Sequence, residues 1–173
     1  QAWQEALAAY QALPESHADV APRTRYALAR VTEAVADTAE QWGAVGELYA
    51  ELADAFGADG GYADAEVRAR YARARLAEAE DDWEVACRTA DALRGHADAP
   101  LVASYARGRL TEGQRDWHRA VDAFRACGPY RDAEARHAHC EGRLLEEQGR
   151  FAAAAEAYER AGGEHEGARA QAV

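Results

Sequence analysis

Four amino acids are missing altogether from this chain of 173 residues: lysine, asparagine, isoleucine and methionine. Their codons are rich in A and T, so their absence points to a GC-rich bacterial genome. Because lysine is missing, every basic residue is an arginine, and 20 basic residues face 31 acidic ones for a net charge of −11. A protein whose main partner is a nucleic acid normally carries a basic face. We therefore expect no nucleic acid among the partners.

Nucleophiles, phosphate loops and membrane segments are also scarce. The chain has two serines, Ser16 and Ser104, and neither lies in a nucleophile elbow or beside a plausible base. The glycine-rich segment 57–61 lacks the lysine and hydroxyl residue of a phosphate-binding loop. No apolar run approaches the length of a transmembrane helix, and no signal peptide opens the sequence. The sequence predicts a cytoplasmic protein that is not an enzyme, uses no cofactor and has no membrane partner.

The three cysteines are odd in number and show no Cys-x-x-Cys spacing. We interpret Cys87 and Cys127 as small buried thiols in a reducing compartment. His137, His139 and Cys140 suggest a metal site, but only His137 and Cys140 would share a helical face. A zinc site needs four ligands, and no second pair lies nearby in the sequence. We therefore predict no metal site.

What the sequence does contain is a pattern of four residues that occurs five times. An aromatic residue is followed by a small residue three positions on, a further core residue after four, and an apolar residue after three. The copies are Trp3-Ala6-Tyr10-Leu13, Trp42-Val45-Tyr49-Leu52, Trp83-Ala86-Ala90-Leu93, Trp117-Ala120-Phe124-Cys127 and Phe151-Ala154-Tyr158-Ala161. The last three copies begin 34 residues apart. Such spacings put all four side chains on one helical face, and a fixed period near 34 is typical of stacked helical hairpins.

The segments between the copies predict partner helices and turns. We expect these helices at about residues 23–40, 62–80, 101–112 and 133–148. Residues 57–61 form the clearest break, and no alternation of period two persists anywhere. The start Tyr62-Ala63-Asp64-Ala65 recurs 68 residues later, in the same Tyr-x-Asp-Ala form, at Tyr130. The sequence therefore predicts an all-α fold.

The last hairpin resembles the tetratricopeptide repeat (TPR). The family's small, turn-glycine, aromatic and bulky positions are filled by Gly142, Gly149, Phe151, Ala154, Tyr158 and Ala161. Ala74 and Gly108 supply the small helix residue in the two preceding copies. The resemblance implies a right-handed superhelical solenoid of TPR-like helix-turn-helix repeats. We expect residues 1–173 to form a single domain of about five repeats, as a fragment of a longer protein.

The chain departs from the TPR pattern at two turns. The turn glycine is absent before Trp83 and Trp117, where Asp81-Asp82 and Arg115-Asp116 stand instead. The Asp-Trp and Tyr-x-Asp-Ala starts also look like accessory repeats in signalling kinases, regulatory ATPases and defence proteins of GC-rich bacteria. The TPR resemblance covers nearly the whole chain and is specific for fold rather than for function, whereas the likeness to these accessory repeats is not a motif match.

A ladder of polar residues follows the same period of 34 on the partner helices. Its members are Tyr71, Tyr105 and His139, then Arg75, Arg109 and Arg143, then Glu78, Glu112 and Glu146. The TPR resemblance implies that these helices line a concave face. We therefore predict a groove that binds a protein or peptide with acidic groups through Arg–carboxylate bonds and aromatic contacts. The alternative is that each Arg pairs with the Glu three residues on, as part of the repeat consensus. One copy earlier the ladder is expected to be missing, since Arg30, Ala34 and Asp37 occupy the corresponding places.

The predicted function is that of a protein-protein interaction scaffold. The alternative is a regulatory or sensor segment that acts in cis on an ATPase, kinase or effector domain of the same protein. Self-association through the ends of the repeat array is a third hypothesis. We expect the partner-binding residues to be Tyr71, Arg75, Tyr105, Arg109, His139 and Arg143.

Overall fold

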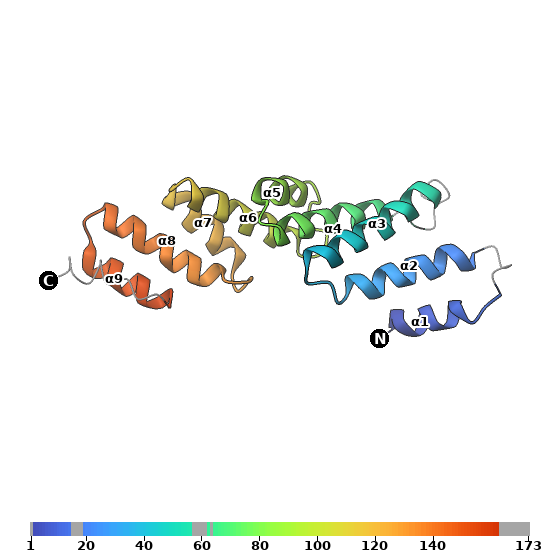
Figure 1. The fold of residues 1–173 in the computed structure, drawn as a ribbon. Coiled ribbons are helices and arrows are strands. Elements are labelled where there is room, and N and C mark those ends of the chain that lie inside the picture. The colour runs from blue at the N-terminus through green and yellow to red at the C-terminus, as the bar shows by residue number, and fades with distance from the viewer. Residues whose placement is uncertain (1, 15–18, 57–61, 63, 163–173) are drawn as a thin grey trace. The chain divides into compact units, whose positions relative to one another are not determined.

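The computed structural model describes residues 2–14, 19–56, 62 and 64–162. Within these residues the protein has nine α-helices and no strand, which confirms the all-α prediction (Figure 1). The helices are α1 (Ala2–Gln11), α2 (Val20–Glu33), α3 (Ala39–Phe56), α4 (Ala65–Ala79), α5 (Trp83–Asp91), α6 (Ala99–Gly113), α7 (Trp117–Cys127), α8 (Ala133–Glu147) and α9 (Phe151–Arg160).

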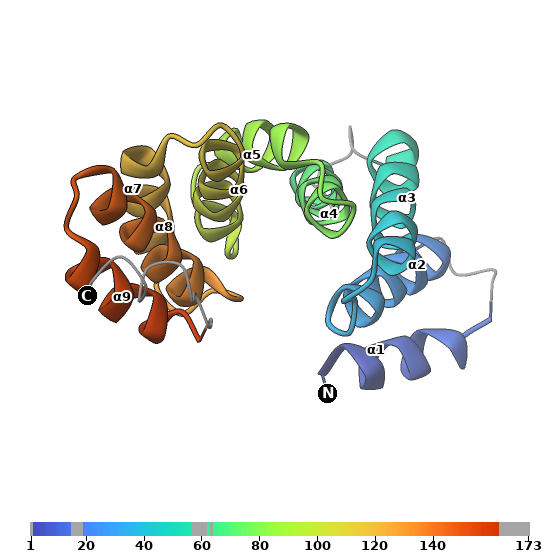
Figure 2. The ribbon, with the colours of Figure 1, turned by 60° about the vertical axis from the view of Figure 1, so that its left-hand side comes forward.

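The chain forms two compact units, Gln1–Ala99 and Pro100–Val173. In the first unit, α1 packs on α2, α2 on α3, α3 on α4 and α4 on α5. In the second unit, α8 packs between α7 and α9. Figures 1 and 2 both show α1 alongside α2 and α8 alongside α9. Each unit is thus built from helices that contact their neighbours in the sequence, and a single domain over 1–173 stays a prediction.

The four-residue pattern forms the core of the second and fourth copies. Trp42 and Trp117 are 4% and 8% exposed, and the other members of both copies are buried. The first copy differs, because Trp3 is 37% and Leu13 46% exposed. Helix α1 contacts α2 and buries none of its own residues completely. The pattern therefore predicts burial correctly where a helix has neighbours on both sides of its apolar face.

The predicted partner helix at 23–40 is too long, because α2 ends at Glu33. The reason is a capping box at the start of α3. The Thr38 hydroxyl accepts a hydrogen bond from the Gln41 amide at 3.3 Å, and the Gln41 side chain accepts one from the Thr38 amide at 3.3 Å. The Thr-x-x-Gln spacing was the signal for this start.

Two turns have no glycine where the TPR pattern has one, yet their backbone keeps the left-handed conformation that glycine favours. Asp81 and Arg115 have φ angles of 60° and 61°, close to the 72° of Gly149 at the corresponding turn. The following residues, Asp82 and Asp116, cap α5 and α7 by accepting hydrogen bonds from backbone amides at 3.1 and 3.2 Å. An N-cap of this kind stabilises a helix by about 1 kcal/mol, which offsets the strain of a left-handed residue.

Candidate functional site

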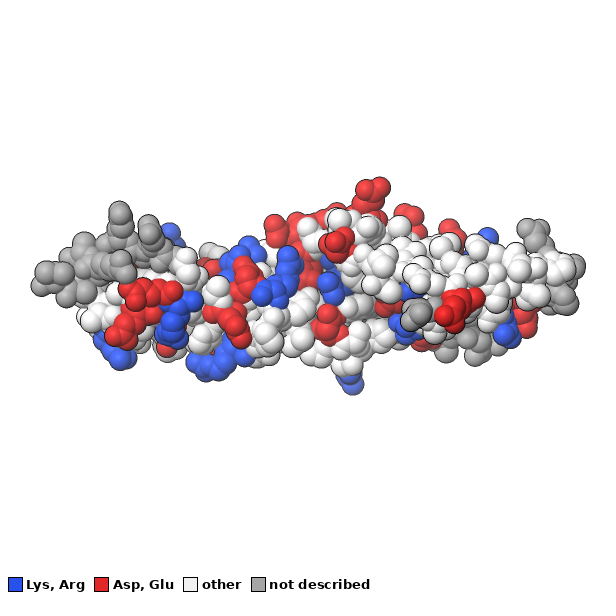
Figure 3. Space-filling model, turned by 90° about the horizontal axis from the view of Figure 1, so that it is seen from below, with Lys and Arg blue, Asp and Glu red and all other residues white. Residues whose placement is uncertain are grey.

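The ladder residues lie on α4, α6 and α8, and every ladder arginine pairs with the glutamate three residues on. The Nε atom of Arg75 lies 3.1 Å from Glu78, and that of Arg109 lies 3.4 Å from Glu112. Arg143 lies 2.8 Å from Glu146 through its Nη1 atom. Figure 3 shows one face of the molecule, on which acidic and basic side chains lie beside one another. The ion pairs of the structural alternative are therefore present.

The ladder extends one helix further than the sequence suggested. Tyr26, Arg30 and Glu33 of α2 repeat the spacing of four and three, 45 residues before the set on α4. The Arg30 Nε atom lies 3.4 Å from Glu33. The expected absence was wrong because the turn between α2 and α3 is longer than that between α4 and α5. Because of this extra length, the ladder residues of α2 lie 45 residues before those of α4, whereas Trp42 lies 41 residues before Trp83.

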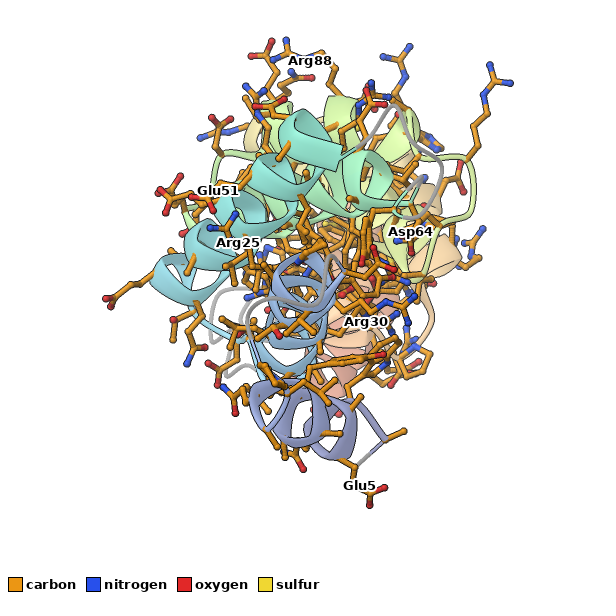
Figure 4. The ribbon with its side chains drawn as sticks, turned by 90° about the vertical axis from the view of Figure 1, so that its right-hand side faces the viewer. Glu5, Arg25, Arg30, Glu51, Asp64 and Arg88 are labelled. Atoms are coloured by element: carbon orange, nitrogen blue, oxygen red, sulfur yellow. The ribbon has the colours of Figure 1, made fainter. Side chains whose placement is uncertain are left out.

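The ladder arginines also cover tryptophan rings of the preceding pattern helices. The guanidinium carbon of Arg30 lies 4.9 Å from the ring centroid of Trp3, and that of Arg75 lies 4.8 Å from the centroid of Trp42. In the second unit, Arg143 lies 5.4 Å from Trp117. Figure 4 labels Arg30 and shows Glu5 extending away from α1. Cation–π contacts thus tie these three arginines to the helix before each of them.

The ladder tyrosines donate hydrogen bonds to the aspartate that stands just before the next partner helix. The pairs are Tyr26–Asp64, Tyr71–Asp98 and Tyr105–Asp132. The Tyr71 and Tyr105 side chains are 5% and 2% exposed, so they present almost no surface to a partner. His139 belongs to the same series, and its ring centroid lies 5.7 Å from that of Tyr158.

Each tyrosine ring also contacts the aromatic residue two positions before that aspartate. The centroid distances are 5.3 Å for Tyr26–Tyr62, 5.5 Å for Tyr71–His96 and 5.8 Å for Tyr105–Tyr130. The second acceptor, Asp98, belongs to the helix start His96-Ala97-Asp98-Ala99. The sequence analysis did not identify this start as a Tyr-x-Asp-Ala copy, because histidine replaces tyrosine. Its signal was the spacing of 34 residues from Tyr62 and again to Tyr130.

At the Tyr105–Asp132 contact the electrostatics favour a protonated tyrosine and an ionised aspartate. Burial and the hydrogen bond to Asp132 raise the pKa of Tyr105. Burial opposes ionisation of Asp132, but the bond from Tyr105 and the charge of Arg136 outweigh it and lower its pKa. Asp64 shows the same balance, with Arg68 as its cation. The donors and acceptors therefore keep their roles throughout the neutral pH range.

All six predicted partner-binding residues thus make contacts within their own unit. Their part in partner binding stays a prediction. In the first unit, Arg30, Arg75, Trp42 and Tyr71 line a pocket of about 300 Å³. The Nε atoms of Arg30 and Arg75 are buried next to their glutamates. At this pocket, part of the ladder in the first unit lies open to a partner's side chain.

A larger groove lies between α3 and α4, with a volume of about 550 Å³. Its floor consists mainly of small residues, and α4 closes it at Leu76. The small lining residues are Gly43, Gly46, Ala50 and Ala53 of α3 and Ala69 of α4. The four on α3 follow each other at spacings of three, four and three, so they lie on one face of the helix. Sequence analysis missed this stripe because it looked for large apolar residues.

Two kinds of helical glycine are present in this protein. A Cβ atom at Gly108 would lie 2.6 Å from the Phe124 ring, and one at Gly142 would collide with the Tyr158 ring. These glycines are required by close packing inside the second unit. A Cβ atom at Gly43 would meet nothing within 4 Å, and one at Gly46 would make an ordinary contact of 3.7 Å. Packing among the described residues therefore does not require Gly43 or Gly46.

The three cysteines lie on α5, α7 and α8. Cys127 and Cys140 are buried and Cys87 is half-buried, all as free thiols. Burial raises the pKa of Cys140 to about 12, so this thiol is unreactive at neutral pH. Among the described residues, no group of three His, Cys, Asp or Glu side chains is placed to hold a metal ion. No described helix is long and apolar enough to cross a membrane.

His137 lies in a hollow of about 530 Å³ at α7, α8 and α9, and its Nε2 atom is buried without a hydrogen-bond partner. Burial lowers the pKa of His137, as do Arg125 and Arg160, against the opposing charges of Glu141 and Asp122. The unfolded chain binds a proton near pH 6.5, whereas the folded chain resists it. His137 therefore contributes stability above about pH 6.5 that is lost as the pH falls through the folded-state pKa.

We expect the variant His137→Gln to lose less stability than the unchanged chain between about pH 7.5 and pH 5. The measurement is the urea midpoint of unfolding at each pH, followed by circular dichroism. His118→Gln serves as the control, because His118 is an exposed residue of α7. An equal loss of stability in the His137 variant and the unchanged chain would contradict this account.

Comparison with family models, with curated proteins and with solved structures gave no match. The TPR resemblance therefore rests on the residue pattern of this chain. Any function has to be argued from its contacts, burial and charges.

Proposed function

We propose that this chain is a protein-protein interaction module of TPR-like helix-turn-helix repeats, which binds a peptide or a partner domain. The repeat assignment is supported by the contacts that recur at the period of 34. Gly108 faces Phe124 and Gly142 faces Tyr158 at the corresponding crossing of two helices. A glycine opposite a ring allows two helices to approach closely, as the TPR pattern requires.

The observation that carries the proposed function is the open floor of the α3–α4 groove. Glycine inside a helix costs about 1 kcal/mol relative to alanine. At Gly43 no packing contact in the described part of the chain offsets this loss of helix stability, because a Cβ atom would enter open space. The missing side chain does have one consequence, which is to deepen the groove beside Trp42 and Gly46. A surface shaped in this way suits the close approach of another backbone.

The groove is a better docking surface than the ladder for a physical reason. Tyr71 and Tyr105 are buried, and Arg75 is held by Glu78 and by the ring of Trp42. A partner at the ladder would have to compete with these contacts. A partner in the groove would instead cover apolar surface, which contributes about 25 cal/mol for each Å² removed from water.

Selection from a displayed library of 20-residue peptides is expected to yield ligands that occupy this groove. The deciding variant is Gly43→Gln, because a Cβ atom at this position meets nothing within 4 Å and the rest of the side chain extends into the groove. The matched control is Gly113→Gln, because Gly113 is also a helical glycine with open space around it. We expect the selected peptides to lose affinity for the Gly43 variant and to keep it for the Gly113 variant. Failure to select any ligand, or equal binding to both variants, would overturn the proposed function.

A further inference from the structure

The two edges of the α3–α4 groove carry charges of opposite sign. Along the α3 edge stand Glu47 and Asp54, which are exposed and form no ion pair with any described residue. They are seven residues apart, or about 10.5 Å along the helix. Along the α4 edge stand Glu66, Arg70 and Arg73, so this edge carries a net positive charge. Arg70 pairs with Glu66, whereas Arg73 is exposed and has no ion-pair partner in the described part of the chain.

The walls of the groove select the conformation of its occupant. Both walls are helices, whose backbone amides and carbonyls are already bonded within the helix. An extended peptide would therefore find no backbone partners here, and its own polar backbone groups would lose water without compensation. An α-helix satisfies its own backbone and presents a stripe of side chains. The small residues at positions 43, 46, 50 and 53 leave room for such a stripe.

From these observations we propose that the groove binds an amphipathic α-helix of a partner protein with basic residues at positions i and i+7. Two Arg or Lys side chains at this spacing match the separation of Glu47 and Asp54. An acidic side chain on the opposite flank of the partner helix meets Arg73. Between the flanks, bulky apolar side chains fill the space above Gly43 and Gly46. The inference rests on the proposed function, since it names the partner of the same groove.

The overall charge of the chain favours the same partner. With a net charge of −11, the protein attracts basic segments at long range and repels acidic ones. The unpaired charges at the groove then set the orientation of the helix, because reversing it would place like charges side by side. Burial of the apolar stripe supplies affinity, and the charged edges supply specificity.

The test uses two synthetic 18-residue helical peptides with the same Leu/Ala face. One carries Arg at two positions seven apart on one flank and Glu on the other, and the second carries Glu on both flanks, so that neither orientation of it places a basic residue beside Glu47 and Asp54. Fluorescence anisotropy with the full chain is expected to give at least about tenfold tighter binding of the first peptide. In the double variant Glu47→Arg/Asp54→Arg the preference is expected to reverse. The control Glu5→Arg/Glu156→Arg makes the same change in net charge at exposed positions outside the groove.

The outcomes separate this inference from the proposed function. Equal binding of both peptides, lost in Gly43→Gln, would overturn the charge pattern while the groove remains a binding site. If neither helix binds while the displayed library yields ligands that Gly43→Gln abolishes, the helical partner is wrong and the proposed function stands. A reversed preference in the control variant would show that net charge alone decides, which also overturns the inference.

Discussion

Replacing Trp117 with alanine is expected to destabilise the second unit by about 3–5 kcal/mol. The side chain is 8% exposed, and its Nε1 atom donates a hydrogen bond to Glu147 at 2.8 Å. Its ring also lies under the guanidinium of Arg143. The substitution removes a large apolar ring, leaves a cavity between α7 and α8, and deprives both charged residues of a contact. Urea unfolding followed by circular dichroism measures the change in free energy.

Trp3 provides the matched control for this substitution. It occupies the same place in the four-residue pattern and lies under Arg30, but it is 37% exposed. We expect Trp3→Ala to cost less than half as much as Trp117→Ala, because less surface returns to water. Hydrogen exchange should show lost protection in α7, α8 and α9 for the Trp117 variant. Equal losses for both variants, or no loss at Trp117, would contradict the packing role assigned to the aromatic position.

The sequence predicted the helices well because their apolar pattern is local. Spacings of three, four and three located the pattern helices at Trp42, Trp83 and Trp117. The end of α2 was missed because it depends on a cap rather than on apolar periodicity. The capping box of Thr38 and Gln41 outweighs the helical propensity of the preceding alanine-rich segment.

The candidate site was harder to predict because its decisive contacts join residues far apart in the sequence. The ladder spacing identified Tyr71 and Arg75 correctly as a periodic pair. Nothing in the spacing indicated that Tyr71 would donate to Asp98, or that Arg75 would cover Trp42. The ion pair with Glu78 was the one ladder contact within reach of a local argument, because three residues separate neighbours on a helix.

The α3–α4 groove could not be predicted from sequence in any direct way. Glycine has a low helix propensity wherever it stands, and the sequence has it both at Gly43 and at Gly108. Only the surroundings distinguish them, since Gly108 faces the Phe124 ring and Gly43 faces open space. Whether a small residue serves internal packing or an external surface depends on which helix lies above it, and that is a property of the fold.

The glycine at position 108 leads to the second large effect. Gly108→Ala is expected to destabilise the second unit by about 2–3 kcal/mol, although alanine is the better helix former. Its Cβ atom would lie 2.6 Å from the ring of Phe124, which is 1% exposed and packed edge-on against Tyr105. Because the ring packs against Gly108 and Tyr105, a Cβ atom at position 108 forces either the helices to separate or the ring to leave its rotamer. Gly113→Ala, on the same helix but in open space, is expected to be neutral or to stabilise by up to about 1 kcal/mol.

A double-mutant cycle tests whether the ring is the cause. The first unit already contains the small–small version of this pair, since Ala74 and Ala90 occupy the positions 34 residues earlier and are both buried. In a Phe124→Ala background, adding Gly108→Ala should therefore cost less than about 0.5 kcal/mol, because the Cβ atom then enters the space that the ring vacates. The coupling energy between the two positions would be about 2 kcal/mol, measured by urea unfolding of the four chains. Additive losses would show that Gly108 is needed for its backbone alone and would remove the close helix crossing from the case for TPR-like repeats.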